Sequence, residues 1–333
     1  MELLIARNIS TPVPDSQDPR AIGKNAGEWH SLLMTRAHQL PLIQGATPSS
    51  KGAGIGLALG GGFSRGFAHL GVLQVLEQNH IPVSYIAGTS VGSILGAAYA
   101  SGAPLARIIA TCRTIRLRDI ARWRVSRLGL ASNHRVGDLI ERVFESRRFE
   151  DLAIPLAVVA TDLASGEPVV FTHGNLSDAI RASCAFPGLF EPVQIGTRCL
   201  ADGGLVAPVP TRAARELGAR CVIGVSVGVE DGSRGAPSNI FQVVCRAVNA
   251  AQKHQLEIWE RHADLVLRPD VQSLAWDDFD RADEAIEAGA AAARRALPRI
   301  QKLLNPAGES AFDFEARLEA EAKSYLWLAE ASR

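Results

Sequence analysis

The sequence carries no excess of either charge and has little lysine. Lysine and arginine together number 35, as do aspartate and glutamate, and only five of the bases are lysines. A protein that binds nucleic acid through its phosphates usually shows a basic excess, so this balance argues against a nucleic-acid partner. Charge is nevertheless segregated locally, because seven arginines and one acid, Asp119, lie between Arg107 and Arg127.

Paired cysteines are also missing. The chain has five cysteines, an odd number, and they are scattered without any C-x-x-C spacing. Disulfide frameworks and zinc sites both need clustered or regularly spaced cysteines, so neither is indicated. We therefore expect a reducing compartment and no metal site.

Long hydrophobic runs are few. The apolar residues after Met1 are too few for a secretory signal. The longest uncharged stretch, residues 81–106, is long enough to cross a bilayer. Pro82 and several glycines interrupt it, so we interpret it as a buried strand, a turn and a helix. A cytoplasmic protein with at most peripheral membrane contact is expected.

What the sequence does contain is the alternation typical of an α/β domain. A strand is predicted at Ile55–Leu59, followed by a glycine loop and a helix whose apolar residues fall at three-residue steps over 67–76. A second strand, residues 83–87, leads into a helix through Tyr99. This order predicts parallel pairing, and hence a mainly parallel central sheet flanked by helices.

The remaining elements and the domain limits follow from the same patterns. Helices are expected over residues 136–144 and 239–263, strands over 156–160, 169–172, 193–195, 220–227 and 264–267, and an acidic helix before Pro298. We divide the chain into an extension over residues 1–52, the main domain over 53–305 and a C-terminal helical extension over 306–333. A length of 333 residues allows one large domain of this kind.

The motif G-x-S-x-G occurs three times, around Ser64, Ser90 and Ser226. It indicates an activated serine only where a strand precedes it and a helix follows. Ser226 is followed by a polar loop, so it fails this test. Ser64 passes, although three glycines separate it from its strand. Ser90 follows its strand closely, and a tight turn flanked by Gly88 and Gly92 would expose its hydroxyl group.

The glycines that precede Ser64 suggest a different use. Backbone N–H groups in a glycine-rich loop before a helix can face an anion, as the oxyanion of acyl transfer requires. The candidate donors are Gly60, Gly61, Gly62, Arg65 and Gly66. Loops that follow adjacent parallel strands open at the same edge of a sheet, so this loop should lie near Ser90. The alternative is an ordinary tight strand-to-helix connection.

A proton acceptor for the serine is needed as well. Asp202 begins an Asp-Gly-Gly turn, and the two glycines would let its carboxylate approach another backbone segment closely. Asp202 could instead orient a histidine in a Ser-His-Asp triad, for which His254 and His262 are the only histidines later in the chain. Both fall in a polar stretch of the predicted long helix, where solvent-exposed histidines are expected.

Three ordered segments, residues 60–66, 88–92 and 202–204, resemble the patatin-like phospholipases. The likeness is strongest to bacterial members similar to the catalytic domain of neuropathy target esterase. Residues 183–193 resemble the same family, and the resemblance extends over about residues 55–270. It implies a three-layer patatin-like fold with a catalytic domain over residues 53–305.

The resemblance also implies a chemistry. Ser90 would attack an acyl carbonyl and Asp202 would take its proton directly and later activate water, with the glycine loop as the oxyanion hole. The implied activity is a carboxylic ester hydrolase acting on phospholipid, lysophospholipid or another fatty acyl ester, without a metal or organic cofactor. Because an ordinary Asp has a pKa near ~3.9, a partly desolvated site must raise it.

Two residues depart from the family pattern, and other interpretations stay open. Phe63 stands where many relatives have a small residue and would narrow the acyl site, and Ala207 stands where many have an asparagine.

The same dyad would serve an acyltransferase or a thioesterase. A nucleotide-binding oxidoreductase and a non-catalytic lipid-binding protein are further alternatives. His69 is interpreted as a packing residue, without a chemical role.

The arginine-rich segment between Arg107 and Arg127 has apolar residues interleaved with its charges. It could form a lid or an interfacial surface that meets anionic lipid headgroups. A solvated, salt-bridged helix is the alternative. Nothing in the sequence predicts an oligomeric state.

Overall fold

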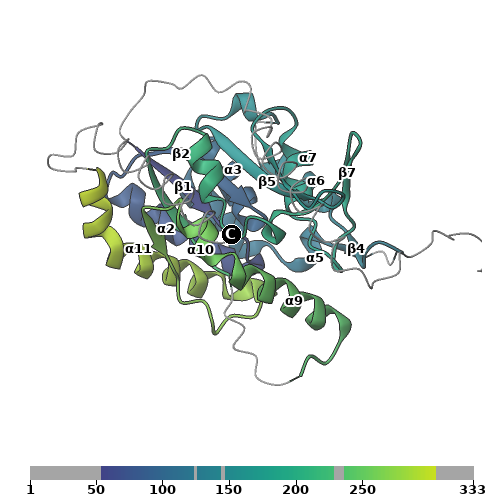
Figure 1. The fold of residues 1–333 in the computed structure, drawn as a ribbon. Helices are drawn as coiled ribbons and strands as arrows, with labels where there is room; N and C mark the ends of the chain where they lie inside the picture. Colours follow the sequence, from purple (N-terminus) through teal and green to yellow (C-terminus); the bar gives the residue numbers. More distant parts are fainter. Residues whose placement is uncertain (1–53, 124–125, 144–146, 229–235, 305–333) are drawn as a thin grey trace, which may run out of the picture. The chain divides into compact units, whose positions relative to one another are not determined.

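A computed structural model describes residues 54–123, 126–143, 147–228 and 236–304 (Figure 1). The predicted extensions, 1–52 and 306–333, lie outside the described residues, so these domain limits stay a prediction. In the described part of the chain, no helix combines the length and the apolar character needed to span a membrane.

A mixed β-sheet forms the centre of the described residues. Its strands are β1 (Ile55–Leu59), β2 (Val83–Thr89), β5 (Leu156–Asp162), β6 (Pro168–Phe171), β7 (Val193–Ile195), β8 (Arg198–Asp202), β9 (Cys221–Val225) and β10 (Leu265–Leu267). They are ordered β10-β9-β1-β2-β5-β8-β7, and β6 pairs with β5. Strands β10, β9, β1, β2 and β5 are parallel, whereas β6, β7 and β8 join antiparallel. The predicted mainly parallel sheet is confirmed.

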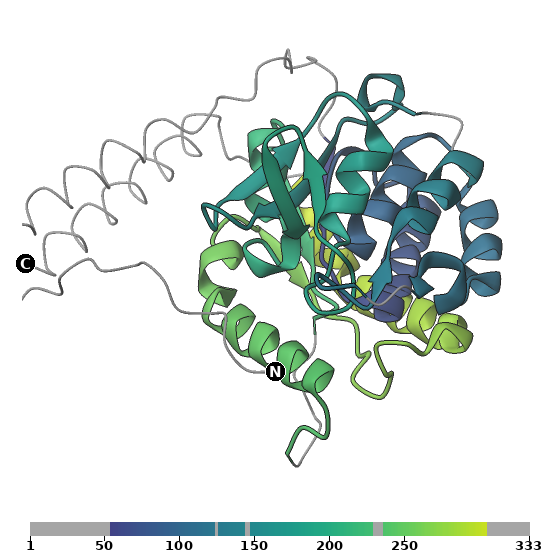
Figure 2. The same cartoon turned by 90° about the vertical axis from the view of Figure 1, so that its right-hand side faces the viewer.

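Helices cover both faces of the sheet and complete three layers (Figures 1 and 2). One face packs against α2 (Ala68–Gln78), α3 (Val91–Ala100) and α11 (Ala282–Leu304) through large residues such as Leu57 and Ile86. The other face presents Ala58, Ala87 and Ala157 toward α8 (Thr211–Glu216) and α10 (Leu256–Glu260). Side chains alternate between faces along a strand, so the sequence places large residues on one side and small ones on the other.

Two glycines allow α2 and α11 to pack closely. A β-carbon at Gly71 would lie 1.8 Å from the Ile286 carbonyl oxygen, and one at Gly289 would lie 1.8 Å from that of Ala68. Only glycine fits at either position. The remaining elements are α4 (Leu105–Thr114), α5 (Leu117–Ile120), β3 (Arg122–Trp123), β4 (Ala131–Ser132), α6 (His134–Val143), α7 (Leu176–Ser183), α9 (Ile240–His254) and the short 3-10 helices η1 (Phe63–Phe67), η2 (Phe149–Asp151), η3 (Gly203–Leu205) and η4 (Phe279–Arg281).

Two predicted elements differ from the structure. The single helix expected over 239–263 is divided at Gln255 into α9 and α10, because the Gln255 amide closes a tighter turn on Gln252 and its side chain is bonded to the Leu205 carbonyl. The acidic helix does not end before Pro298, which lies inside α11. Ile300, two residues further, is fully buried, so packing compensates for the hydrogen bond that proline cannot donate.

Candidate active site

Ser90 occupies a strained turn between β2 and α3. Its φ of 52° and ψ of −126° lie outside the regions that non-glycine residues favour. Its amide donates to the Ser183 hydroxyl at 2.8 Å, and its carbonyl accepts from the Ser93 hydroxyl at 2.6 Å. These bonds hold the backbone in the turn and leave the Ser90 side chain half-exposed. Strain of this kind, maintained by surrounding contacts, is typical of a nucleophile elbow.

The glycines on either side of Ser90 make the turn possible. A β-carbon at Gly88 would lie 2.5 Å from the Ser93 α-carbon, and one at Gly92 would lie 2.2 Å from the Leu59 carbonyl oxygen. Both distances are far below normal van der Waals contact. The end of β2, the start of α3 and the end of β1 can therefore pack together only with glycine at these two positions.

Ser90 and Asp202 come together because two strands meet end to end along β5. Thr89, the last residue of β2, pairs with Val159, while Asp202, the last residue of β8, pairs with Ala160. Since β6 pairs with residues 158–161 on one edge of β5, β2 and β8 must both use the other edge. The carboxyl ends of β2 and β8 thus abut at neighbouring positions of β5, which brings Asp202 to the residue that follows Thr89.

The Asp202 carboxylate is buried and hydrogen-bonded. Its Oδ1 accepts from the Gly204 amide at 2.7 Å, and the Ser90 side chain lies beside the carboxyl group. Burial raises the pKa of Asp202 from 3.8 to about 6, although the Gly204 amide and the nearby Ser90 hydroxyl lower it. A β-carbon at Gly203 would lie 2.1 Å from the Val159 carbonyl oxygen, so the turn needs glycine there. The carboxylate is therefore ionised near neutral pH but more basic than an ordinary Asp.

A buried polar layer supports the turn from behind. The Ser183 hydroxyl, which accepts from the Ser90 amide, donates to the Val159 carbonyl at 2.6 Å. The neighbouring Cys184 thiol lies beside the Ser90 and Ser93 side chains, and burial followed by the Asp202 charge raises its pKa well above the usual range. It therefore stays protonated. Sequence reasoning assigned no function to this pair, although residues 183–193 carried part of the family resemblance.

The glycine loop lies beside Ser90, but two of its predicted donors are engaged. A β-carbon at Gly61 would lie 3.3 Å from that of Ser90. The Gly60 amide donates to the Val225 carbonyl at 3.0 Å and the Gly61 amide to the Pro208 carbonyl at 3.1 Å. Within the described residues, no hydrogen bond is formed by the Gly62 or Phe63 amide.

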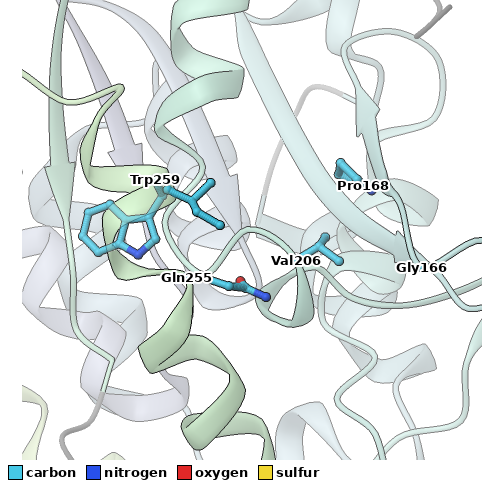
Figure 3. Close-up of a pocket in the computed structure, with 6 residues that line it drawn as sticks. Gly166, Pro168, Val206, Gln255 and Trp259 are labelled. Carbon is cyan, nitrogen blue, oxygen red and sulfur yellow. The ribbon is translucent and has the colours of Figure 1, made fainter. Parts of the chain in front are cut away.

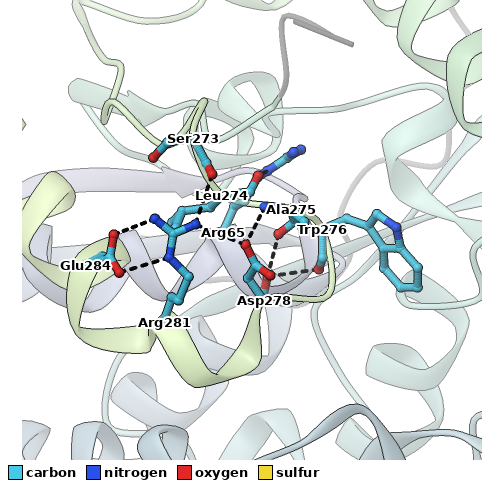
Figure 4. Close-up of polar contacts among 9 residues, drawn as sticks. Arg65, Ser273, Leu274, Ala275, Trp276, Asp278, Arg281 and Glu284 are labelled. Atoms are coloured by element: carbon cyan, nitrogen blue, oxygen red, sulfur yellow. Dashed lines mark hydrogen bonds and ion pairs between the residues drawn. The ribbon is translucent and has the colours of Figure 1, made fainter.

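The other two predicted loop residues also have structural contacts. The Arg65 Nε donates to the Leu274 carbonyl at 2.7 Å, so this side chain is directed at the segment that Figure 4 shows braced by Arg281. A β-carbon at Gly66 would lie 2.3 Å from the Val91 side chain, which places this glycine under the first turn of α3. The Arg65 side chain is thus hydrogen-bonded to the 273–276 segment.

His69 anchors the loop from below. Its Nε2 lies 2.8 Å from the Gly60 carbonyl oxygen, and the ring is fully buried. Burial lowers the pKa of His69 to about 4, so the ring is neutral and Nε2 carries the proton that it donates to Gly60. Its Nδ1 has no partner among the described residues. The only sequence signal for the contact between His69 and Gly60 was the position of His69, one helical turn after the glycine loop ends at Gly66.

The competing serines and histidines lie in other environments. Ser64 is buried, and its hydroxyl donates to the Trp276 carbonyl at 2.8 Å. The Ser226 amide donates to Leu267 of β10, and no helix follows within the next two described residues. His254 is exposed on α9. Burial and the positive charges of the α8 arginines lower the pKa of His262, which places it on the α8 side of the sheet.

Aromatic rings stand beside the glycine loop. Phe63 makes edge-to-face contacts with Phe186, at a centroid distance of 5.3 Å, and with Trp276, at 5.1 Å. These rings join an apolar cluster that contains Leu189 and Phe190. The structure therefore has an apolar wall next to the half-exposed serine.

Two other predicted or visible features lie apart from these residues. In the arginine-rich segment, Arg113 forms an ion pair with Asp283 at 2.7 Å, and Arg116 donates to two backbone carbonyls. A pocket of about 220 Å³ lies beside α10 (Figure 3). It is lined by Gly166, Pro168, Val206, Gln255, Ile258 and Trp259, none of which is a predicted site residue. In the described residues, no cluster of His, Cys, Asp and Glu could hold a metal ion.

The segment that contains these residues is similar to known proteins. A family model for patatin-like phospholipases matches residues 57–215, a range that includes the glycine loop, Ser90 and Asp202. An uncharacterized NTE family protein of Mycobacterium tuberculosis (strain ATCC 25618 / H37Rv) is 35% identical over 189 residues, which cover 55% of this chain and 51% of that protein. Lysophospholipase NTE1 of Debaryomyces hansenii is 28% identical over 305 residues, which cover 82% of this chain and 20% of that protein.

Two further matches complete the comparison. Patatin-like phospholipase domain-containing protein 6 of Mus musculus is 34% identical over 185 residues, 53% of this chain and 14% of that protein. Among solved structures, VipD from Legionella pneumophila aligns over 75% of this chain and 68% of that chain at 13% identity, with a TM-score of 0.46. The chain spans about half the length of the mycobacterial relative and far less of the two longer proteins. The predicted resemblance is thus confirmed over residues 57–215, which match a patatin-like phospholipase domain.

Proposed function

We propose that this protein is a serine acyl hydrolase that cleaves fatty acyl esters through a Ser90–Asp202 dyad. The match to this family indicates a lipid ester hydrolase and disfavours a nucleotide-binding oxidoreductase. The observation that carries the proposal is that β2 and β8 abut along β5, which places the Ser90 side chain beside a buried carboxylate whose pKa is raised to about 6. Such a group is ionised at neutral pH and basic enough to accept a proton from an attacking hydroxyl.

The reaction proceeds in two halves. Ser90 Oγ bonds to the acyl carbonyl carbon while its proton passes to the Asp202 carboxylate, and the carbonyl electron pair moves to oxygen. Collapse of this tetrahedral species breaks the ester bond, and the proton on Asp202 goes to the leaving alkoxide. Asp202 then takes a proton from water as the water oxygen bonds to the acyl carbon. Collapse of this second tetrahedral species breaks the bond to Ser90 Oγ and releases the fatty acid, and the proton on Asp202 returns to Ser90 Oγ. Histidine has no role in this scheme.

The oxyanion that forms in each half needs N–H donors. The unbonded amides of Gly62 and Phe63 suit this purpose, because Gly60 and Gly61 use theirs to anchor the loop. We therefore assign Gly60, Gly61, Arg65 and Gly66 to shaping the oxyanion hole, keep Gly62 as a predicted donor and add the Phe63 amide, which the glycine pattern did not predict. Preorganised donors of this kind typically contribute ~10²–10³ in rate.

The substrate class follows from the apolar wall and from the relatives. The rings of Phe63, Phe186 and Trp276 suit an acyl chain rather than a polar group. One relative is named a lysophospholipase, so phospholipid or lysophospholipid is the proposed substrate. An acyltransferase or a thioesterase on the same dyad is the second candidate. An acyltransferase would pass the acyl group to an alcohol instead of water, and a thioesterase would cleave a thioester instead of an oxygen ester.

Peripheral membrane contact through the region between Arg107 and Arg127 belongs to the proposal. Arg118, Arg122 and Arg127 are exposed, which such contact requires. Because Arg113 and Arg116 are bonded within the fold, fewer charges than the sequence suggested are directed outward. A cytoplasmic location and a catalytic domain over residues 53–305 complete the proposal.

Active-site labelling tests the serine assignment. The wild-type protein and the Ser90→Ala, Ser64→Ala and Ser226→Ala variants are treated with a fluorophosphonate probe, and each is then given a panel of phospholipid, lysophospholipid and acyl thioester substrates. We expect labelling and hydrolysis to be lost in Ser90→Ala alone. Undiminished labelling of Ser90→Ala would overturn the assignment. Product analysis with an added alcohol separates transferase from hydrolase, because only a transferase forms a new ester efficiently.

A further inference from the structure

Helix α9 is bonded directly to the turn that carries Asp202. The Gln252 side chain donates to the Gly204 carbonyl at 2.8 Å, and the Gln255 side chain donates to the Leu205 carbonyl at 2.9 Å. Further along the helix, Val244 packs against Gly188, where an added β-carbon would lie 3.7 Å from its side chain. The inner face of α9 therefore lies over the candidate active site.

The outer face of the same helix is apolar and uncovered. Ile240 is 75% exposed and Val243 is 44% exposed, and Ala247 and Ala250 are exposed at the same helical spacing. Among the described side chains of α9, only Val248 is buried. In Figures 1 and 2 the helix lies at the periphery of the described fold, in green. An apolar stripe of this kind is unusual on a free surface and indicates an interaction site.

A second apolar exposure lies nearby in the structure. Leu128 is 68% exposed, and the adjacent Leu130 donates its amide to the Leu189 carbonyl at 3.1 Å. Gly188, which contacts α9, is the residue before Leu189. The leucines and helix α9 thus flank the same loop.

The charge of this region selects among partners. Residues 236–255 contain no aspartate or glutamate, and Lys253 on α9 is exposed. An apolar stripe accompanied by positive charge and no acidic residue suits a surface with acyl chains beneath anionic headgroups. It is poorly suited to a second copy of the same helix, because two copies would bring like charges together.

We propose that the outer face of α9, with Leu128, docks on the surface of a lipid bilayer that contains anionic phospholipid. This inference rests on the proposed function, since a lipid ester substrate would be taken from that bilayer. Docking through α9 places the Asp202 turn at the bilayer surface, because Gln252 and Gln255 link the helix to that turn.

Vesicle co-sedimentation tests the docking surface. It is performed in the Ser90→Ala background, so that the proposed nucleophile does not consume the vesicle lipid during the measurement. The vesicles contain phosphatidylcholine alone or phosphatidylcholine with phosphatidylglycerol. The test variants are Ile240→Glu and the double change Ile240→Glu with Val243→Glu, and the matched control is Leu163→Glu, because Leu163 is itself 50% exposed.

The control therefore carries the single change Leu163→Glu and is compared with the single variant Ile240→Glu, which changes the net charge equally. Leu163 lies in the turn between β5 and β6, outside both α9 and the 128–130 segment. We expect the parent to bind vesicles with phosphatidylglycerol more tightly than vesicles of phosphatidylcholine alone. Ile240→Glu should lower that binding about tenfold, the double variant and Leu128→Glu should lower it as well, and Leu163→Glu should leave it within about twofold.

Three results would overturn the proposal. The first is an equal loss of binding in Leu163→Glu and Ile240→Glu, with circular dichroism showing both variants folded. The second is no binding of the parent to either vesicle. The third is a dimer in light scattering that Ile240→Glu dissociates, because the occupant of the face would then be a second copy of the chain. None of these results depends on the identity of the nucleophile, so failure of the docking proposal is distinct from failure of the proposed function.

Discussion

Two segments of this protein share the motif G-x-S-x-G and the same strand-loop-helix setting, yet they differ in structure. Ser64 follows β1 and Ser90 follows the neighbouring parallel strand β2. The Ser64 hydroxyl is buried and bonded to the Trp276 carbonyl, whereas the Ser90 hydroxyl is half-exposed and lies beside the Asp202 carboxyl group. A motif match therefore leaves the chemistry of its serine undecided.

The difference arises from the path of the backbone after each strand. Gly60 to Gly62 lengthen the connection after β1, and Ser64 then lies in the 3-10 helix η1. The amide and the hydroxyl of Ser64 both donate to carbonyls of the 275–276 segment. Ser90 follows β2 directly and takes a positive φ of 52°. The first loop thus presents backbone amides near the site, and the second presents a side chain.

The largest expected effect comes from removing the charge beside Ser90. Asp202→Asn should lower the hydrolytic kcat by ~10³-fold or more, because the serine loses its proton acceptor. Steady-state kinetics on a lysophospholipid measures it. Ser64 has no carboxylate partner in the structure, so Asp202→Asn should leave the first loop unchanged. Retention of a tenth or more of wild-type kcat would contradict the assignment of the base.

The same variant should be more stable than the wild type at alkaline pH. The folded-state pKa of Asp202, about 6, exceeds its ordinary value of 3.8, so ionisation costs stability above pH 6 and costs nothing below about pH 4. Asp202→Asn should raise the free energy of unfolding by about 1–3 kcal/mol at pH 8. Urea unfolding at pH 8 and pH 4 tests this, and a gain that is equal at both pH values would contradict it.

The pH dependence of hydrolysis follows from the same carboxylate. Activity should fall below about pH 6 as Asp202 is protonated and can no longer accept a proton from Ser90. The kcat/KM profile of the wild type on a soluble acyl ester measures this limb. A limb near pH 4, the ordinary position for an exposed Asp, would show that burial does not raise the basicity of the group.

A smaller effect is expected behind the strained turn. Ser183→Ala removes the hydroxyl that joins the Ser90 amide to the Val159 carbonyl, which leaves two buried backbone groups without that partner. Unfolding free energy should fall by about 1–3 kcal/mol, and fluorophosphonate labelling of Ser90 should slow by about tenfold. Ser101→Ala is the control, because its hydroxyl bonds only within its own helix end. Equal labelling rates in both variants would refute a positioning role for Ser183.

The smallest effect on activity is expected at the first loop. Ser64→Ala should lower the free energy of unfolding by about 1–2 kcal/mol through the lost bonds to the 275–276 segment, while kcat stays within about twofold. Thermal unfolding and kinetics on the same preparation test both parts. A large loss of kcat in Ser64→Ala without a loss of stability would remove the distinction between the two loops.

His69 offers a sharper test of how the first loop is anchored. Its folded-state pKa of about 4 lies below the ordinary 6.5, so stability is complete above pH 6.5 and is lost as the pH falls toward 4. His69→Gln keeps an N–H donor for the Gly60 carbonyl but cannot titrate, so its unfolding free energy should vary less over this pH range. His69→Leu removes the donor and should also slow labelling of Ser90. Identical pH dependence in His69→Gln and wild type would contradict this.

Much of the fold was predictable from local patterns. The alternation of apolar residues placed β1 at its observed bounds, and the run of strand, glycine loop and helix predicted the parallel pairing of β1 with β2. The predicted helix over 239–263 was wrong at Gln255, where a side-chain bond to Leu205 from a distant part of the chain accompanies the break. Periodicity reports local preference and does not include such contacts.

The candidate site was predictable in its residues but not in its connections. The motifs singled out Ser90, Asp202 and the glycine loop from residue type and order, because a tight turn needs glycine and acyl transfer needs a nucleophile and a base. They could not predict which loop amides are already bonded. The Gly60 and Gly61 amides are bonded to carbonyls of Val225 and Pro208, which lie about 150 residues away along the chain.

The amino-acid order was sufficient for the alternation of strands and helices, for the positions where only glycine fits, and for the identities of the reactive side chains. The fold was required to make β2 and β8 meet end to end on one edge of β5, which puts Ser90 against Asp202. It was also required to bury that carboxylate and raise its pKa. The physical reason is that hydrogen bonding and desolvation depend on neighbours in space, and most of these neighbours are remote in sequence.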